Sequence, residues 1–103
     1  MTPTNGATNQ SLQPTLTWNV VSGATSYSLQ VATDAGFSNV VIAVSGLAAA
    51  NYTPTTSLAN NTTYYWRVLA SNGSGDGAYS TAFSFTTEAM TMYYLYLPFM
   101  SRP

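Results

Sequence analysis

The stretch that decides the fold runs from Thr62 to Ser71 and reads TTYYWRVLAS. Its large side chains alternate between two faces, with Tyr64, Trp66 and Val68 on one and Tyr65, Arg67 and Leu69 on the other. A period of two residues is typical of a β-strand with one buried face. We therefore expect a strand over residues 62–71, with its tryptophan facing the core.

The same period returns before and after this segment. Further strands are expected over residues 14–18, 26–31 and 40–44, around Tyr52, and over residues 83–87. Residues 3–14 are rich in Pro, Gly and Asn and are expected to form an irregular edge strand. No segment has the helical period, and strands recur about every 8–12 residues, which predicts an all-β sandwich or barrel.

Two of the intervening turns contain an acidic residue. Asp34 precedes Ala35 and Gly36, and we expect its carboxylate to accept hydrogen bonds from nearby backbone N–H groups. Asp76 lies in the glycine-rich segment 72–77, which is expected to be a flexible turn. A single carboxylate supplies too few oxygen ligands for a calcium loop.

In their order and spacing, these segments resemble a fibronectin type III domain of the kind found in secreted bacterial proteins. The resemblance covers residues 3–87 and rests on PTLTW at 14–18, GATSYSLQV at 23–31, Leu58 followed six positions later by Tyr64, and FSFTT at 83–87. It implies an immunoglobulin-like sandwich of about seven antiparallel strands. It also implies that the Tyr64 hydroxyl bonds to backbone between Leu58 and Asn61.

The predicted domain spans residues 1–87, and residues 88–103 form an apolar C-terminal tail that we expect to add one more strand. Large residues of the alternating faces form the predicted core: Trp18, Tyr27, Leu29, Tyr64, Trp66, Val68, Phe83 and Phe85. Each large ring buries about 150–250 Å². This burial is expected to be the dominant favourable contribution to folding.

Charged residues form only 5% of the chain, and the sequence contains no His, Cys or Lys. The charged set is Asp34, Arg67, Asp76, Glu88 and Arg102. Cys/His zinc sites, thiol nucleophiles, Ser-His-Asp triads and Schiff-base lysines all lack their reagents. We therefore expect no enzymatic activity, no cofactor and no metal site.

The same composition bears on partners and on the membrane. Two arginines cannot neutralise a phosphate backbone, so no nucleic-acid partner is expected. No apolar run reaches the roughly 18 residues that a membrane span needs, so no transmembrane segment is expected. Met1 leads directly into polar residues, and no signal peptide is expected in this chain.

The tail differs in composition from everything before it. Residues 92–100 read MYYLYLPFM and are apolar or aromatic on both faces of an extended strand. Such strands are normally covered on both sides, so we expect the tail to be an interaction strand. Its expected contact residues are Met92, Tyr93, Tyr94, Leu95, Tyr96, Leu97, Phe99 and Met100. Pro98 cannot donate to a ladder, so pairing should break there or lie at an edge.

Four interpretations of the tail compete. It could pair with a neighbouring copy, fold back on its own sandwich, act as a surface-anchoring or sorting segment, or be a membrane-lying or expression-derived segment. We favour addition to a neighbouring copy, which gives a filament or a closed oligomer. Residues 3–13 would then leave an acceptor edge beside Leu16 and Trp18. The predicted function is a non-catalytic extracellular or cell-surface module, structural or adhesive, that binds copies of itself.

The alternative function is a carbohydrate-binding or spacer module of a larger secreted protein, with polysaccharide or the cell surface as its partner. Tyr65 and Tyr79 are the candidate sugar platform, although surface aromatics also serve as ordinary cross-strand pairs. Asn60, Asn61 and Asn72 begin Asn-x-Ser/Thr sequons in predicted turns and are candidate glycosylation sites. In a chain rich in Thr and Asn, such sequons also arise by chance.

Overall fold

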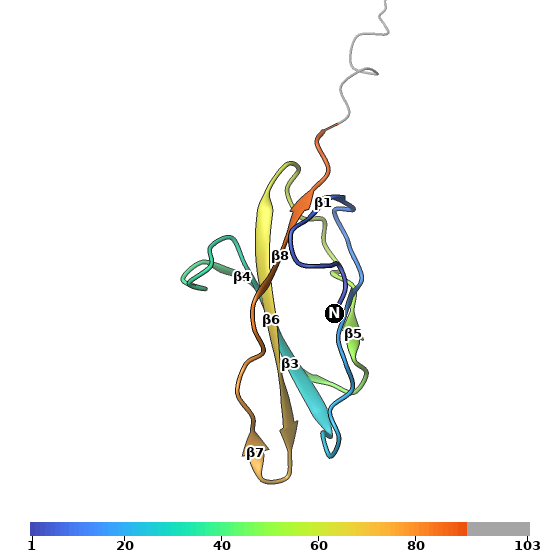
Figure 1. Cartoon of the computed structure of the whole chain (residues 1–103), viewed down its shortest axis with the longest axis vertical. Helices are drawn as coiled ribbons and strands as arrows, with labels where there is room; N and C mark the ends of the chain where they lie inside the picture. The colour runs from blue at the N-terminus through green and yellow to red at the C-terminus, as the bar shows by residue number, and fades with distance from the viewer. Residues whose placement is uncertain (91–103) are drawn as a thin grey trace, which may run out of the picture.

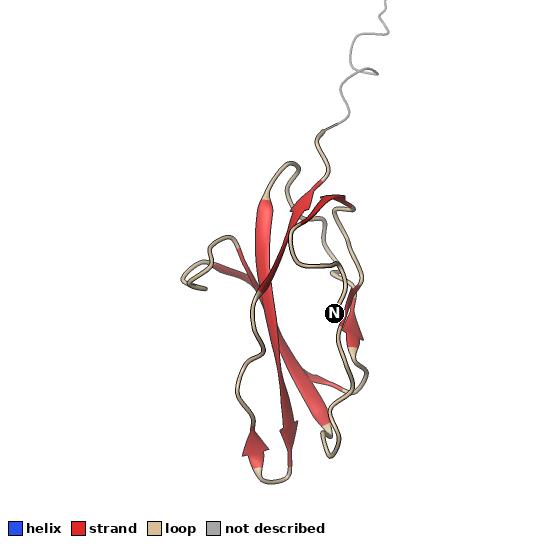
Figure 2. Ribbon diagram, in the orientation of Figure 1, coloured by secondary structure: helices blue, strands red, loops and turns tan. Residues whose placement is uncertain are grey.

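The structure, a computed structural model, describes residues 1–90, which form two layers of β-strands (Figure 1). Figure 2 shows strands and loops over this range, and no helix in it could cross a membrane. The strands are β1 (Ala7–Gln10), β2 (Leu16–Thr17), β3 (Ser26–Ala32), β4 (Val40–Leu47), β5 (Asn51–Tyr52), β6 (Thr63–Asn72), β7 (Gly75–Asp76) and β8 (Phe83–Thr87). The predicted all-β sandwich is confirmed.

The larger sheet has the order β1-β8-β6-β3-β4, and the short β7 pairs with the end of β6. The second sheet is the antiparallel pair β2–β5. In the centre, β3 runs antiparallel to β6 with Leu29 opposite Val68 and Val31 opposite Trp66. Because side chains alternate along a strand, this register directs the predicted apolar residues of both strands to the same inner face.

One strand pair departs from the antiparallel arrangement that we expected. β1 runs parallel to β8, with Ala7 opposite Phe85. The chain turns just before β1 at Gly6, whose φ of +84° suits a residue without a Cβ. The Gly6 N–H then donates a 2.8 Å hydrogen bond to the Ser84 carbonyl. The first strand therefore enters the larger sheet in the same direction as the last one.

The path of the first ten residues is inconsistent with the acceptor edge that we expected beside Leu16 and Trp18. Before it reaches β1, the chain pairs with β2 through an antiparallel bridge between Thr2 and Thr17. Residues 7–10 then lie on β8 rather than beside β2. Within residues 1–90, the edge strands of the larger sheet are β1 and β4.

β4 is longer than the predicted strand over residues 40–44. Ser45 and Gly46, which we expected to end it, instead form an irregularity inside it. Tyr27 pairs with Leu47, but Leu29 two residues later pairs with Val44, so β4 contains an extra residue at this point. Gly46 has a φ of +70°. A glycine with positive φ is the residue that a β-bulge of this kind requires.

The core lies between the two sheets and matches the predicted set closely. Its buried members are Leu16, Trp18, Tyr27, Leu29, Val31, Tyr64, Trp66, Val68 and Phe85. The Trp18 ring lies 5.7 Å from that of Tyr27 and 6.4 Å from that of Trp66. Phe83 is the exception, because it is only half-buried and packs edge-on against Trp66 at the margin of the core.

The predicted role of Tyr64 is confirmed. Its ring is buried and its hydroxyl accepts a 2.9 Å hydrogen bond from the Ala59 backbone N–H. Ala59 lies within the predicted range between Leu58 and Asn61. The bond fixes the segment that connects β5 to β6, which crosses from one sheet to the other.

Candidate functional site

A charged side chain lies on the outward face of the larger sheet, on its central strands. Arg67 of β6 stands opposite Gln30 of β3 in the antiparallel register. Its Nε donates a 3.0 Å hydrogen bond to the Gln30 Oε1 atom, and its Nη2 donates one of 2.8 Å to the same oxygen. The half-buried guanidinium is therefore fixed along one edge by its cross-strand neighbour.

Two aromatic rings cover the guanidinium. The Arg67 Cζ atom lies 4.1 Å from the centre of the Phe37 ring and 4.1 Å from the centre of the Tyr79 ring. Cation–π contacts of this kind are attractive within about 6 Å of the ring centre. We call Gln30, Phe37, Arg67 and Tyr79 the Arg67 stack. Its members come from β3, the β3–β4 loop, β6 and the segment before β8.

The β3–β4 loop holds Phe37 in an uncommon backbone conformation, with φ at +56°. A large side chain is rarely found at positive φ, so the surrounding contacts must enforce it. The Asp34 carbonyl accepts a 3.1 Å bond from the Phe37 N–H. The Asp34 carboxylate accepts from the Ser38 hydroxyl at 2.7 Å and from the Asn39 N–H at 2.9 Å. The predicted turn role of Asp34 is confirmed.

These contacts also change the acidity of Asp34. The Ser38 hydroxyl, followed by the backbone N–H groups of Asn39 and Ser38, holds the pKa of the Asp34 carboxyl below its usual value of 3.8. Hydrogen bonds to the charged form of a carboxyl favour that form. The loop that presents Phe37 is therefore organised around an ionised Asp34.

The segment that carries Tyr79 follows β6 along its length. The Gly77 N–H donates to the Ala70 carbonyl at 2.8 Å, and the Ser80 N–H donates to the Val68 carbonyl at 2.7 Å. The Tyr79 ring borders a hollow of about 220 Å³ on the outward face. Besides the Tyr79 ring, the hollow is lined by Ser28, Leu29, Gln30, Ala43, Val44 and Ser45.

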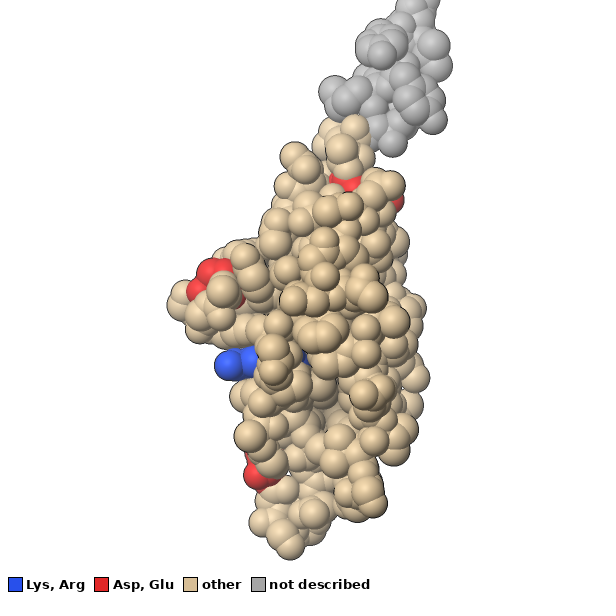
Figure 3. All heavy atoms as spheres, in the orientation of Figure 1, with Lys and Arg blue, Asp and Glu red and all other residues tan. Residues whose placement is uncertain are grey.

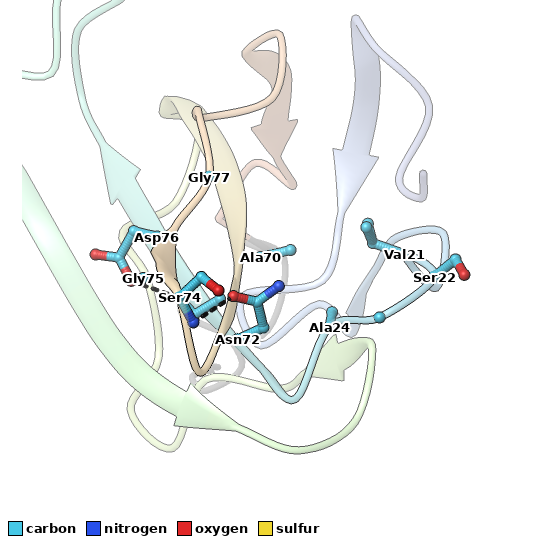
Figure 4. A pocket seen from close by; sticks show the side chains of 11 residues that line it. Val21, Ser22, Ala24, Ala70, Asn72, Ser74, Gly75, Asp76 and Gly77 are labelled. Carbon is cyan, nitrogen blue, oxygen red and sulfur yellow. Dashed lines mark hydrogen bonds between the residues drawn. The ribbon is translucent and has the colours of Figure 1, made fainter.

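A second concave region lies at the end of the sandwich. A hollow of about 310 Å³ separates the turn at residues 21–24 from the hairpin at residues 70–77 (Figure 4). The hairpin is internally bonded: the Asn72 side-chain oxygen accepts from the Ser74 N–H at 2.8 Å, and the Ser71 hydroxyl donates to Asp76 at 2.6 Å. The Asp76 carboxylate points away from the turn in Figure 4, and it therefore offers little to a ligand between the two loops.

An adjoining hollow of about 440 Å³ is more apolar and reaches the core. Trp18, Val21, Tyr27, Val68 and Ala78 are among its lining residues. The Trp18 indole nitrogen is buried and has no hydrogen-bond partner within the described residues. In contrast to the Arg67 stack, none of the residues that line this hollow is an Asp, Glu, Lys or Arg.

Comparison with known proteins shows which fold this architecture represents. One similar solved structure is an Fn3-like protein from Clostridium thermocellum, with a TM-score of 0.66 and 24% sequence identity over 84% of this chain and 91% of that one. This chain has a fibronectin type III-like fold. No protein-family model matches the sequence, and no curated protein matches it either.

A second similar solved structure belongs to a much larger protein. It is an alpha-L-rhamnosidase from Streptomyces avermitilis in complex with L-rhamnose. The TM-score is 0.57, with 19% identity over 84% of this chain. The match covers only 10% of the rhamnosidase chain. In that enzyme, the fold is one small part of a longer polypeptide.

The fibronectin type III-like domain places the two predicted platform tyrosines differently. Tyr79 is 38% exposed and is a member of the Arg67 stack. Tyr65 stands two positions before Arg67 on the same face of β6 but is half-buried. Sequence reasoning did not find Phe37 or Gln30 as site residues. The sequence feature that could have indicated this site was Arg67 itself, a charged residue in the middle of a strand of mainly apolar and aromatic residues.

The candidate glycosylation sites lie at the surface or close to it. Asn61 and Asn72 are exposed, whereas Asn60 is half-buried and its side-chain amide donates a 3.3 Å bond to the Glu88 carbonyl. The predicted interaction residues 92–100 lie outside the described residues. The last strand within residues 1–90, β8, ends at Thr87, and the division into residues 1–87 and 88–103 stays a prediction. Within residues 1–90, no group of three His, Cys, Asp or Glu side chains could hold a metal ion.

Proposed function

We propose that this chain is a non-catalytic module of a larger extracellular protein, and that its outward β4-β3-β6 face binds carbohydrate. A fibronectin type III-like fold usually serves as a non-catalytic module. The same fold forms a small part of an alpha-L-rhamnosidase that was solved with L-rhamnose. This likeness supports the modular part of the proposal, and the sugar-binding part depends on the site.

The observation that carries the sugar-binding part is the exposed Tyr79 ring beside the hollow on the outward face. The ring is held in place by Arg67, with the guanidinium against one of its faces. The hollow next to it is lined by the Ser28 and Ser45 side chains and by the Gln30 side chain. Carbohydrate ligands need both features, because their C–H faces pack on aromatic rings and their hydroxyls exchange hydrogen bonds with polar side chains.

The surface of the domain suits such a ligand. Figure 3 shows how few charged atoms the molecule presents on the face in view. Charged residues form 5% of the chain, so recognition must depend mainly on hydroxyl and amide groups and on ring stacking. An interface of this kind is polar without being strongly charged, which matches a hydroxyl-rich ligand.

Affinity electrophoresis against a panel of soluble polysaccharides tests the proposal. We expect at least one polysaccharide to retard the intact chain, and Tyr79→Ala to abolish the retardation while the thermal unfolding profile stays cooperative. Val20→Ala is the matched surface control, because Val20 is 80% exposed and does not line the hollow on the outward face. Retardation that Tyr79→Ala leaves unchanged would place sugar binding elsewhere and would contradict the assignment to this face.

Self-association through the tail is a second candidate, and the open edge of β4 favours it. β4 is one of the two edge strands of the larger sheet within residues 1–90, the other being β1. The Val40 and Val41 side chains of β4 are 36% and 46% exposed. An exposed apolar edge strand is an acceptor for a strand from another chain. Bulges disrupt the ladder, and β4 has a second irregularity at Val41, between the pairs Val31–Ile42 and Ala32–Val40. Regular pairing with an added strand is therefore restricted to the residues between Val41 and Gly46.

Sedimentation velocity of the full chain and of a chain that ends at Met90 tests this second candidate. We expect the full chain to form oligomers and the shortened chain to be monomeric. Val41→Lys in the full chain should weaken the association, because an edge lysine opposes strand addition. A monomeric full chain, or oligomers that survive removal of residues 91–103, would contradict tail-mediated assembly.

A further inference from the structure

We propose that the Arg67 stack is a carboxylate-binding site and that the carbohydrate which this face binds is an acidic one, a polysaccharide containing uronic acid units. The inference rests on the proposed carbohydrate-binding function and specifies its substrate class. It is carried by the orientation of the guanidinium, by the groups that occupy its edges and faces, and by the hollow beside it.

Counting the N–H donors of Arg67 shows which edge is open. A guanidinium has five N–H donors in a fixed planar fork. The Gln30 oxygen accepts from Nε and from Nη2, which occupies the edge that these two nitrogens share. Within residues 1–90, no other hydrogen bond to this guanidinium is formed. Nη1 and the second N–H of Nη2 therefore form an unoccupied fork at the end of the side chain.

That fork has the geometry of a carboxylate ligand. Arginine binds carboxylates through two parallel N–H···O bonds, and such charge-assisted pairs are about twice as strong as neutral hydrogen bonds. The Phe37 and Tyr79 rings each lie 4.1 Å from Cζ and occupy space that a ligand would need to pack on the guanidinium there. The open N–H groups point outward in the plane of the guanidinium, where a carboxylate can accept both bonds.

The fork is also held in one orientation before any ligand arrives. A free arginine side chain loses substantial rotamer freedom when it binds, and a side chain fixed in advance loses less. Here two rings and the Gln30 oxygen fix the guanidinium plane. Phe37 is held in turn at positive φ by the loop that Asp34 organises.

Asp34, the acidic residue of the loop that carries Phe37, does not bond to the open N–H groups of Arg67. Both Asp34 carboxylate oxygens are occupied within their own loop, one by Ser38 and the other by Asn39. The Asp76 carboxylate bonds to Ser71 in the β6–β7 hairpin. Arg67 is the only Lys or Arg among residues 1–90. It is therefore the one basic side chain in this part of the chain that a carboxylate could bind.

The hollow beside the stack indicates the size and class of the ligand. It shares Gln30 and Tyr79 with the stack and is lined in addition by Ser28 and Ser45. Its volume of about 220 Å³ is below the roughly 300–1,000 Å³ of sites that enclose a drug-sized molecule. It therefore suits one unit of a chain that continues across the sheet. A uronic acid unit fits all three features. Its carboxylate would bind Arg67, its sugar ring would lie against Tyr79, and its hydroxyls would lie near the serines.

The experiment is isothermal titration calorimetry of the full chain with a short oligogalacturonate and with the same oligosaccharide after methyl esterification. We expect the acid to bind and the ester to bind about tenfold more weakly or not at all, because the ester lacks the charged acceptor. Raising the salt concentration should weaken binding of the acid only. The ester is the matched control, since its sugar rings and hydroxyls are unchanged.

Three variants test whether binding of the acid depends on the Arg67 stack. Arg67→Lys keeps the charge but removes the fork, and should weaken acid binding about tenfold. Gln30→Glu gives Arg67 an internal carboxylate and should weaken acid binding similarly with little change in shape. Tyr79→Ala should weaken binding of both the acid and the ester, because it removes the ring on which the sugar packs. If Arg67→Lys fails to fold, Gln30→Glu still tests the site, because it leaves Phe37, Arg67 and Tyr79 unchanged.

The outcomes separate this inference from the proposed function. Equal binding of acid and ester, or acid binding that Arg67→Lys and Gln30→Glu leave unchanged, would overturn the carboxylate site while carbohydrate binding stands. Failure of the acid to bind, with a neutral polysaccharide still bound in a manner that depends on Tyr79, would do the same. Failure of every polysaccharide to bind would overturn both.

Discussion

The hydroxyl of Thr87, at the end of β8, donates a 2.6 Å hydrogen bond to the carbonyl oxygen of Ala59 in the loop before β6. The N–H of the same loop residue is bonded to the Tyr64 hydroxyl at 2.9 Å. Both backbone polar groups of Ala59 are thus satisfied by side chains that are themselves buried. This loop connects the smaller sheet to the larger one, so the two bonds fix how the layers are joined.

Tyr64→Phe is expected to lower the free energy of unfolding by about 1–2 kcal/mol, because the Ala59 N–H loses its partner while the ring stays packed. Urea denaturation followed by tryptophan fluorescence measures the change. Tyr52→Phe is the matched control, since no side-chain hydrogen bond from Tyr52 is formed within residues 1–90, and it should change stability by less than about 0.5 kcal/mol. Equal effects of the two variants would contradict the role assigned to the Tyr64 hydroxyl.

Thr87→Val should be more damaging, at about 2–3 kcal/mol, because it removes a hydroxyl that serves two backbone groups without changing the side-chain shape. The Thr87 hydroxyl also accepts a 3.0 Å bond from the Thr62 N–H, and the residue is 2% exposed. Leaving buried donors and acceptors unsatisfied costs about 1–3 kcal/mol each. The neighbouring Thr86 bonds only to the Thr63 hydroxyl at the surface, so Thr86→Val should be nearly neutral. A ranking in which Thr86→Val is the worse variant would refute this account.

Much of the fold could be predicted from the sequence, because alternation of large and small side chains reports directly on which face is buried. The register of β3 against β6, with Val31 opposite Trp66, follows from both apolar faces having to meet the same core. The parallel placement of β1 could not be predicted. Its sequence lacks apolar alternation, and its position depends on the turn at Gly6 and on backbone bonds to β8.

The candidate site was only partly predictable for a similar reason. The sequence indicates Tyr79, together with Tyr65, as an aromatic residue that could serve as a sugar platform. Its packing on Arg67 joins positions twelve residues apart through the path of an irregular segment along β6. Phe37 comes from a different loop and reaches Arg67 only because its backbone adopts positive φ. No local sequence pattern encodes contacts between residues brought together by two separate loops.

Phe83 and Phe85 look equivalent in the sequence but should differ in their contribution to stability. Phe85 is 1% exposed and its ring lies 5.8 Å from that of Tyr64, so Phe85→Ala is expected to cost about 3–5 kcal/mol. Phe83 is half-buried beside Trp66, and we expect Phe83→Ala to cost about 1–2 kcal/mol. Thermal or urea unfolding of both variants measures the difference. Similar losses of stability would show that Phe83 is buried in the core as fully as Phe85, contrary to the structure.

The loop that carries Phe37 should lose its order in acid. Since hydrogen bonds hold the folded-state pKa of Asp34 below 3.8, the carboxylate stabilises the loop fully above that pH. This stabilisation is lost as the pH falls through the folded-state pKa, because the protonated carboxyl no longer accepts both sets of bonds. The amide proton shifts of Ser38 and Asn39, followed by NMR between pH 7 and pH 2, should therefore move with a midpoint below 3.8.

Ser74 provides the internal control for this titration. Its N–H bonds to the side-chain oxygen of Asn72 at 2.8 Å, an amide that does not titrate, so its shift should stay nearly constant over the same range. Asp34→Asn should remove the transition at Ser38 and Asn39, and should loosen the contact of Phe37 with Arg67 already at neutral pH. A midpoint at or above 3.8 in the unaltered chain would mean that the Asp34 carboxylate does not hold this loop. The positive φ of Phe37 would then be maintained by its packing on Arg67 and by its N–H bond to the Asp34 carbonyl.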